Sequence, residues 1–218
     1  MKIVQPEVHI ENQEWSSLLQ RIETKGRVCY KSEERISDDT ANKFVQSLIR
    51  RGHLSVLEHS NISVKFVCDR GVSHEIVRHR LASYSQESTR YCNYRGKDME
   101  FIDPFFLPEG SYQRQEWEDA CGNCEAAYNG MIDICKCSPQ EARSVLPNSL
   151  KTELWMTANL REWLHFFNLR AAKTAHPQMR QVAIPLLLKL KELLPPIFGG
   201  MGYDEDFPNE HYAKVTCD

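Results

Sequence analysis

The stretch RHRLASYSQESTRY, residues Arg78–Tyr91, gathers three arginines, a histidine, three serines and two tyrosines in a chain whose net charge is −3. A guanidinium group matches phosphate and carboxylate groups bidentately, and hydroxyl groups add neutral donors to such a site. Local composition alone also fits a solvated, charged helix end. The spacing of other motifs around this stretch decides between an anion-binding site and a solvated helix end. The same motifs indicate the fold.

Length and composition indicate an ordinary globular protein. The chain has 218 residues, of which 41% are hydrophobic and 26% charged, so we expect one domain over residues 1–218. No apolar run approaches the roughly 18 residues that a membrane span requires. The first residues, MKIVQPEVHIENQEW, lack the apolar core and cleavage site of a secretory signal. We therefore expect a cytoplasmic protein that does not enter a membrane.

The charge and the cysteines bear on two other classes of function. A net charge of −3 disfavours a general nucleic-acid binder, which normally carries a basic surplus. An RNA-binding module would use the interleaved Arg and Tyr residues between 78 and 95 for stacking and phosphate contacts. Eight cysteines without a secretion signal are expected to be free thiols. The alternative is a zinc site built from Cys121, Cys124, Cys135 and Cys137, although its last pair lacks the usual spacing.

Hydrophobic periodicity predicts several helices and two strands, which together indicate an α/β (mixed α+β) fold. The expected strands are residues 61–69 and 149–157, because both alternate apolar and polar side chains. The expected helices are 38–51 with Gly52 as its stop, 71–80, 112–135, one from Pro139, one after an Asn159–Glu162 capping box, and one from Pro177 with a bend at Pro185.

Common nucleotide-binding and nucleophile motifs are missing from the sequence. The nucleotide-binding patterns G-x-G-x-x-G and G-x-x-x-x-G-K-[ST] do not occur, nor does the hydrolase motif G-x-S-x-G. If residues 71–80 are helical, Arg78 and Arg80 point to nearly opposite sides, since each residue adds about 100° of rotation. Such a pair suits two ligands or two subunits better than one shared group.

Four ordered motifs resemble the flavin-dependent thymidylate synthases. Arg78-His79-Arg80, followed by seven residues and Ser88, resembles the signature of that family. GHLSVLEH at residues 52–59 is similar to its G-H-x-S-x-x-E-H segment. ARSVLP at 142–147 and TANLREWLHFFNLR at 157–170 resemble its later ligand-binding segments. These blocks keep the order and separations of the family over about half of the chain.

The resemblance implies a specific fold and activity. It implies the flavin-dependent thymidylate synthase fold, with a central, mostly antiparallel sheet flanked by helices, and a homotetramer whose active sites are shared between subunits. It also implies bound FAD and the synthesis of dTMP from dUMP, with 5,10-methylenetetrahydrofolate as carbon donor and NADPH as reductant. An acidic chain with one local cationic site is compatible with such small polyanions, and with no nucleic-acid partner.

The same resemblance assigns roles to individual residues. Those expected to contact or approach FAD are His53, Ser55, Arg78, His79, Arg80, Gln86, Asn159, Arg161 and His165. Those expected to contact dUMP are Glu75, Arg78, Gln86, Glu87, Ser88, Thr89, Arg90, Arg143 and Arg170. Arg78 would reach the nucleotide of a neighbouring subunit. No metal ligand is implied.

Three positions depart from some relatives, which have glutamine at 75, glutamate at 86 and asparagine at 165 where this chain has Glu75, Gln86 and His165. Glu87 is an alternative source of the carboxylate missing at 86. The preference for dUMP over a modified pyrimidine nucleotide stays open.

The last of the four motifs also has a helical pattern of its own. Arg161, His165 and Asn168 form a polar stripe, and the apolar side is formed by Leu160, Trp163, Leu164 and Phe167. Arg170 closes this helix, and we predict that it stabilises negative charge on the pyrimidine ring at O4 and N3. Ser88 is expected to bind rather than attack, because no base for it is evident.

Overall fold

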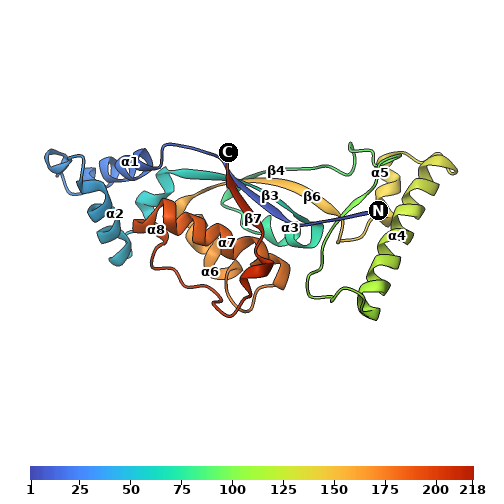
Figure 1. Ribbon diagram of the computed structural model, residues 1–218. Coiled ribbons are helices and arrows are strands. Elements are labelled where there is room, and N and C mark those ends of the chain that lie inside the picture. The colour runs from blue at the N-terminus through green and yellow to red at the C-terminus, as the bar shows by residue number, and fades with distance from the viewer.

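A five-stranded sheet runs through the middle of the protein (Figure 1). The computed structural model describes residues 1–218. The strands lie in the order β4-β6-β3-β2-β7, with bounds β2 Glu7–Ile10, β3 Asn61–Asp69, β4 Ala82–Gln86, β6 Lys151–Asn159 and β7 Lys214–Cys217. All neighbouring pairs are antiparallel except β2 and β7. The expected mixed α/β fold with a mostly antiparallel sheet is therefore confirmed.

The two longest strands, β3 and β6, form the centre of this sheet. They pair over their whole length, from Asn61 opposite Asn159 to Asp69 opposite Lys151. Ile62, Val64 and Phe66 alternate with less buried residues, and Leu154, Met156 and Ala158 do the same on β6. One face of the sheet is thus apolar, as the period of two required.

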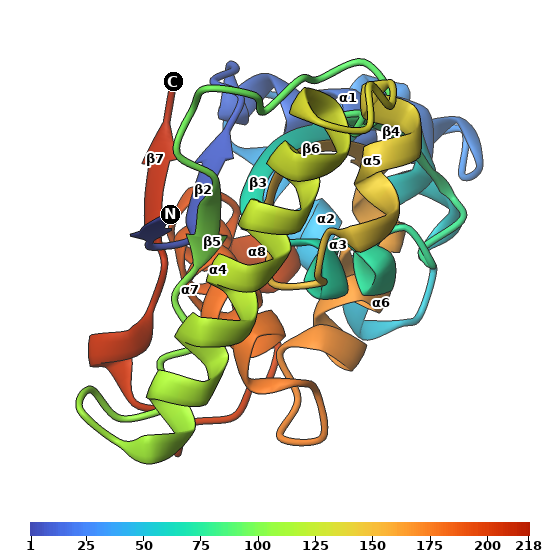
Figure 2. The same ribbon diagram turned by 90° about the vertical axis from the view of Figure 1, so that its right-hand side faces the viewer.

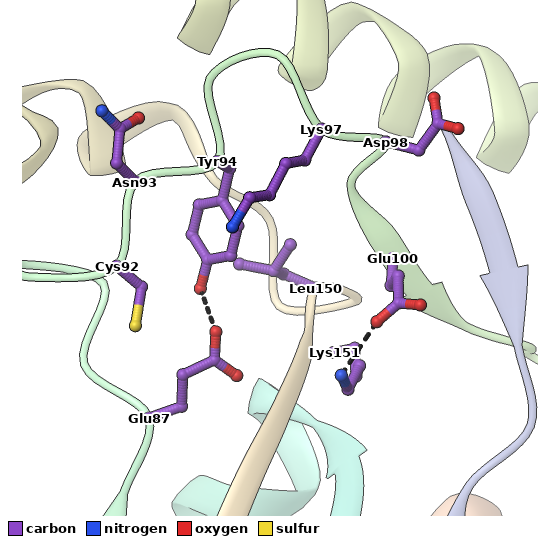
Figure 3. A pocket seen from close by; sticks show the side chains of 9 residues that line it. All are labelled: Glu87, Cys92, Asn93, Tyr94, Lys97, Asp98, Glu100, Leu150 and Lys151. Atoms are coloured by element: carbon purple, nitrogen blue, oxygen red, sulfur yellow. Dashed lines mark hydrogen bonds and ion pairs between the residues drawn. The ribbon is translucent and has the colours of Figure 1, made fainter.

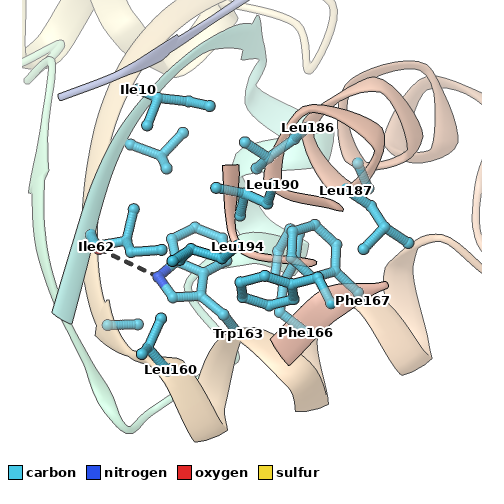
Figure 4. Packing of buried hydrophobic residues seen from close by; sticks show 14 of the residues in the cluster. Ile10, Ile62, Leu160, Trp163, Phe166, Phe167, Leu186, Leu187, Leu190 and Leu194 are labelled. Atoms are coloured by element: carbon cyan, nitrogen blue, oxygen red, sulfur yellow. Dashed lines mark hydrogen bonds between the residues drawn. The ribbon is translucent and has the colours of Figure 1, made fainter. Parts of the chain in front are cut away.

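Three helices cover that apolar face, namely α6 Leu160–Arg170, α7 Pro177–Leu193 and α8 Pro195–Phe198. Figure 4 shows the aromatic residues of α6 packed between the sheet and the leucines of α7. Trp163 is fully buried, and its indole N–H donates to the carbonyl of Ile62 at 3.1 Å. This bond satisfies the one polar group that the ring carries into the core.

The remaining elements extend the molecule at its two ends (Figures 1 and 2). One end holds α1 Trp15–Val28, α2 Thr40–Arg50 and the 3₁₀ turns η1 Glu33–Arg35 and η2 Ser55–His59. The other end holds α4 Tyr112–Asp133, α5 Pro139–Ala142, the 3₁₀ turn η3 Arg143–Val145 and a parallel pair, β1 Lys2–Val4 and β5 Glu100–Ile102. A separate hydrophobic cluster includes Cys121 and Tyr128 of α4 and Phe101 of β5. The chain also forms α3 Arg70–Ile76 and the 3₁₀ turn η4 Asn209–His211.

Most of the expected long elements are present. The strand at 61–69 is confirmed to the residue, and the helices predicted at 38–51, 112–135, and from Pro139 and Pro177 appear with small changes in their ends. Gly52 follows α2 with a φ of +72°, a conformation that suits glycine at the end of a helix. The polar stripe of α6 is exposed and its apolar side is buried or partly buried, as predicted.

Other expectations need correction. The strand expected at 149–157 is β6, two residues later, and the helix expected at 71–80 ends at Ile76. The position of Pro185 inside α7 agrees with the expectation, and the bend at this residue stays a prediction. Helix α1 and strands β1, β2, β4, β5 and β7 were not predicted, because their short or weakly periodic sequences gain stability from pairing and packing rather than from local preference.

The expected capping box at the start of α6 is only half formed. The side chain of Asn159 accepts the backbone N–H of Glu162 at 2.9 Å. The carboxylate of Glu162 does not return to the cap, because it is hydrogen-bonded to His79. A tertiary contact therefore replaces the local one. No helix in the structure has the length and hydrophobicity that crossing a bilayer requires.

Candidate active site

The triplet Arg78-His79-Arg80 lies in a turn between α3 and β4, which corrects the helical geometry expected for it. Its middle residue faces the interior, with 3% of His79 exposed, whereas Arg78 and Arg80 are exposed. The hydroxyl of Tyr84 on β4 donates to the carbonyls of Ile76 and His79, at 2.9 and 2.6 Å. The turn is thereby tied to the strand that follows it.

His79 belongs to a polar cluster in which His79 and Glu162 are buried and Arg170 and Glu75 are partly exposed. The Nδ1 atom of His79 lies 3.2 Å from a carboxylate oxygen of Glu162, and its Nε2 atom accepts the Nε–H of Arg170 at 3.0 Å. The other end of the Arg170 guanidinium donates to Glu75, to a carboxylate oxygen at 2.6 Å and to the backbone carbonyl at 3.0 Å. Four residues from α3, α6 and the intervening turn thus form one chain of contacts.

The imidazole of His79 is held in its neutral form. Burial, followed by the nearby charge of Arg170 and then His165, lowers the pKa of His79 from its ordinary value of 6.5 to about 4. At neutral pH its contact with Glu162 is therefore a hydrogen bond from a neutral ring rather than an ion pair. His165 is exposed, and its ring centre is 5.4 Å from that of His79.

A second group of predicted residues meets at the loop after β4. Ser88, Thr89 and Arg90 form a turn in which the backbone N–H of Tyr91 donates to the carbonyl of Ser88 at 3.1 Å. An Nη1 atom of Arg143, which begins η3, lies 3.5 Å from the hydroxyl of Thr89. Residues from two separate motifs are therefore brought together, as expected for one ligand site.

Four arginines of the predicted ligand sites lack acidic partners, whereas Arg161 and Arg170 have them. The arginines that form ion pairs include Arg27, Arg95, Arg114, Arg161, Arg170 and Arg180. None of Arg78, Arg80, Arg90 and Arg143 forms one, and all four are exposed. Guanidinium groups left without a carboxylate remain available for an anionic ligand.

A third group of predicted residues lines a cavity of about 410 Å³ beside α1 and η2. His53, Ser55 and Arg161 contribute to its wall, together with Gly26, Cys29, Leu48 and Val56. Arg161 donates to Glu58 at 2.6 Å. The hydroxyl of Tyr30 lies 2.9 Å from Nδ1 of His53. This combination of apolar wall and a few convergent polar groups is typical of a small-molecule site.

Gln86 and Glu87, the two alternatives for one expected carboxylate role, have protein partners of their own. The amide of Gln86 donates to the hydroxyls of Ser73 and Thr152, at 2.9 and 3.3 Å. Glu87 accepts the hydroxyl of Tyr94 at 2.6 Å, in a cavity of about 430 Å³ shown in Figure 3. Burial and this bond to Glu87 raise the pKa of Tyr94, so the tyrosine remains a donor.

The sequence interpretation did not identify four of the polar residues that shape these sites: Tyr30, Tyr84, Tyr94 and Glu162. For Glu162 a signal was available. It precedes the buried Phe166 by one helical turn and therefore lies toward the apolar side of α6, where a charged residue needs a partner. The tyrosines carried no comparable signal, because aromatic residues near strands are usually part of the core.

The alternative zinc site is not supported. The only group of three or more metal-binding side chains within reach of one another is His79, Glu162 and His165, so the four cysteines do not come together. Both ring nitrogens of His79 are already engaged, and Arg170 places a positive charge beside one of them. This arrangement favours a hydrogen-bonded cluster over a cation site.

The comparisons with known proteins agree on one family. The family model described as "Thymidylate synthase complementing protein" matches residues 13–196. A flavin-dependent thymidylate synthase of Geobacter sulfurreducens is 36% identical over 183 residues, covering 81% of this chain and 78% of the relative. One of Mycobacterium tuberculosis is 32% identical over 194 residues, covering 81% and 77%.

A solved structure supports the fold independently. The UMP/dUMP methylase PolB from Streptomyces cacaoi, bound with 5-Br dUMP, superposes with a TM-score of 0.75. The match covers 91% of this chain and 96% of that one, at 19% sequence identity. The two chains share their fold.

Proposed function

We propose that this protein converts dUMP to dTMP by reductive methylation, because its chain belongs to the family of flavin-dependent thymidylate synthases. In this proposal 5,10-methylenetetrahydrofolate is the carbon donor and NADPH the reductant. The relatives' shared name supports a flavin enzyme, and PolB was solved with a dUMP analogue. The choice of dUMP over a modified pyrimidine nucleotide belongs to the same proposal.

One observation carries the nucleotide assignment, namely the meeting of the 88–90 loop with Arg143. The guanidinium of Arg143 has no acidic partner and lies 3.5 Å from the hydroxyl of Thr89. Arg90 adds a second unpaired charge in the same turn, and Ser88 a further hydroxyl. Two guanidinium groups with two hydroxyls fit the geometry of a phosphate ester, so we assign the 5′-phosphate to this loop.

Arg170 is the group we assign to the pyrimidine. A guanidinium has five N–H donors, of which three are used by His79 and Glu75. One N–H on each Nη atom therefore remains for the substrate. A fixed cation beside O4 and N3 of uracil stabilises the negative charge that develops on the ring during reaction at C5. Glu75 stays beside it as the second group at the ring.

The wall of the 410 Å³ cavity suits the planar ring system of FAD, because it is partly apolar and carries the polar groups of His53, Ser55 and Arg161. Arg78 and Arg80 do not line this cavity, but they are exposed and unpaired, which suits a diphosphate. We assign flavin contacts to both arginines and to His53, Ser55, Asn159, Arg161 and His165, with His79 acting through its backbone because its ring is engaged inside. When bound, the flavin would carry the reducing equivalents of the reaction.

The engaged side chain of Gln86 leaves only its carbonyl oxygen for a ligand, and that of Glu87 one carboxylate oxygen. We keep both residues in the nucleotide site as supports of the 88–90 loop. Gln86 is hydrogen-bonded to Ser73 and Glu87 to Tyr94, and these bonds hold the backbone segment directly before Ser88 in place.

The assembly we propose is a homotetramer with shared active sites, built from chains that each form one domain in the cytoplasm. Large apolar side chains are exposed near the proposed sites, with Leu81 at 72%, Tyr91 at 79% and Trp155 at 39% exposure. Such surfaces are commonly covered in an assembly. Mixing chains impaired by Arg78→Ala with chains impaired by Arg170→Ala should restore activity if each site uses two subunits. No recovery after proven subunit exchange would place each site within one chain.

The most direct test of the function is a spectrum of the purified protein followed by product analysis. We expect flavin absorption that NADPH bleaches, and dTMP formed only when dUMP and 5,10-methylenetetrahydrofolate are both present. Arg161→Ala should lose flavin more readily than His211→Ala, which changes a residue of η4 outside the cavity. A colourless protein that binds oligonucleotides with a steep salt dependence would instead support the RNA-binding alternative.

A further inference from the structure

Glu162 is a buried carboxylate that none of the roles above requires. Only 6% of it is exposed, although glutamate rarely lies inside a protein without a partner. It occupies the first turn of α6, where Asn159 holds its backbone N–H. Its Oε1 atom lies 3.2 Å from Nδ1 of His79, which is its only side-chain hydrogen-bond partner.

The contact on the other side of the ring determines which nitrogen of His79 carries the proton. Arg170 donates its Nε–H to Nε2 of His79 at 3.0 Å, and a guanidinium can only donate. Nε2 is therefore unprotonated. Since burial and Arg170 keep the pKa of His79 at about 4, the ring is neutral and its single proton is on Nδ1. Nδ1–H then donates to Glu162.

Glu162 thereby selects the tautomer that Arg170 needs. In the opposite tautomer, the Nε2–H of His79 would face the Nε–H of Arg170, donor against donor. Glu162 disfavours that form, because it would then face a bare Nδ1 across a buried contact and lose its hydrogen bond. The carboxylate of Glu162, which is not assigned to either the phosphate or the pyrimidine contacts, thus controls the contact of His79 with Arg170.

The orientation of Arg170 is determined from both ends. His79 accepts from Nε, and Glu75 accepts from Nη1 at 2.6 Å and from Nη2 at 3.0 Å. With these three contacts in place, the guanidinium group cannot rotate freely. Its two remaining N–H groups therefore point in a fixed direction. Loss of the His79 contact would leave only the Glu75 end to hold the group.

We propose that Glu162 is a positioning residue, which through the tautomer of His79 holds the Arg170 guanidinium ready for the pyrimidine ring. The pyrimidine part rests on the function proposed above. The hydrogen-bond chain from Glu162 to Arg170 does not, because it consists only of contacts within the chain. Two variants distinguish the effect of the hydrogen-bond acceptor from that of the negative charge. Glu162→Gln loses the charge but keeps an oxygen acceptor, and Glu162→Met has a side chain of similar length without either.

The first measurement is the ¹⁵N spectrum of the histidine rings in the holoenzyme, which distinguishes the two neutral tautomers. We expect His79 in the Nδ1–H form in the original protein and in Glu162→Gln, and a shift toward the Nε2–H form in Glu162→Met. Comparison with His79→Gln identifies the His79 signals. An Nε2–H ring in the original protein would overturn the proposal by itself, even if no variant folds.

The second measurement is steady-state kinetics with dUMP varied. Glu162→Met should lower kcat roughly tenfold or more while the KM for dUMP changes by less than about threefold, because misorientation of a reacting group acts on the transition state. Glu162→Gln should restore most of kcat. A matched control is Glu23→Met, since Glu23 is also buried but is bonded to Arg27 and Thr40 in the α1–α2 region rather than to His79.

The outcomes separate this proposal from the proposed function. Normal kcat in Glu162→Met, or an equal loss in Glu162→Gln and Glu162→Met, would overturn the positioning role, because an acceptor would then not be what matters. A protein that makes no dTMP but shows the predicted tautomers and their change in Glu162→Met would refute the function and leave the hydrogen-bond chain supported.

Discussion

The cluster around Arg170 and the loop around Arg143 both present an arginine to the proposed nucleotide, but in opposite environments. Arg170 is largely buried and uses three donors on His79 and Glu75. Arg143 is exposed, has no acidic partner, and contacts only the Thr89 hydroxyl, at 3.5 Å. One cation is held in place before the ligand arrives, and the other is free to adapt to it.

The difference bears on catalysis and capture. A preorganised charge in a water-poor site stabilises a transition state without reorganisation at the moment of reaction. A mobile, solvated charge attracts an anion in both the ground state and the transition state, so it acts mainly on binding. We therefore expect substitutions at the two arginines to affect different kinetic constants.

The largest effect is expected at the ordered arginine. Arg170→Ala should lower kcat by roughly a hundredfold or more, because one preorganised donor to developing charge is lost. Flavin should remain bound, as its proposed contacts lie elsewhere. The control is Arg95→Ala, which removes an exposed arginine paired with Asp133. Near-normal turnover of Arg170→Ala would remove the distinction between the two arginines.

The buried cluster should also be visible in the pH dependence of stability. Because the pKa of His79 is lowered from 6.5 to about 4, the unfolded chain binds a proton in this range that the folded chain does not. The contribution of His79 to the free energy of unfolding is therefore complete above pH 6.5 and is lost as the pH falls toward 4. The loss amounts to at most about 3 kcal/mol.

Urea unfolding between pH 4 and 7 measures this contribution. His79→Gln should unfold with a flatter pH profile than the original protein, whereas replacing the exposed His59 should leave the profile of the original protein. Identical profiles for the original protein and His79→Gln would mean that His79 is not held in its neutral form.

A smaller effect is expected at the exposed arginine. Arg143→Ala should raise the KM for dUMP roughly tenfold, which corresponds to about 1.4 kcal/mol for a lost charged hydrogen bond, and leave kcat within about twofold. Arg50→Ala on α2 is the control for loss of an exposed arginine. If Arg143→Ala lowers kcat while KM is unchanged, the loop participates in the chemical step rather than in capture.

The smallest expected effect concerns the helix that carries Arg170. Asn159→Ala should lower the free energy of unfolding by about 1 kcal/mol, because the side-chain cap of α6 is lost. Asn159→Asp keeps a capping oxygen and should unfold within about 0.5 kcal/mol of the original. Its lost amide donor should still weaken flavin retention. Equal flavin content in Asn159→Asp and the original protein would limit Asn159 to the cap.

Much of the fold was predictable because its long elements have strong local signals. The alternation in β3, the period of α6, and the glycine after α2 each determine a local structure that packing then keeps. The ends of elements were less predictable. Helix α3 stops at Ile76 because Tyr84 and His79 fasten the next turn to the sheet, a contact that no local pattern contains.

The sequence by itself determined the family, the presence of the two long central strands and the longer helices other than α1, and the residue types available for binding small anions. These depend on spacing and periodicity, which are properties of the linear chain. Only the tertiary structure decided which charges are paired and which are free. It buried His79, turned Glu162 away from its cap, and left Arg143 beside Thr89 without a carboxylate. Pairing and burial depend on residues far apart in sequence, and they set the tautomers, charges and orientations that the chemistry requires.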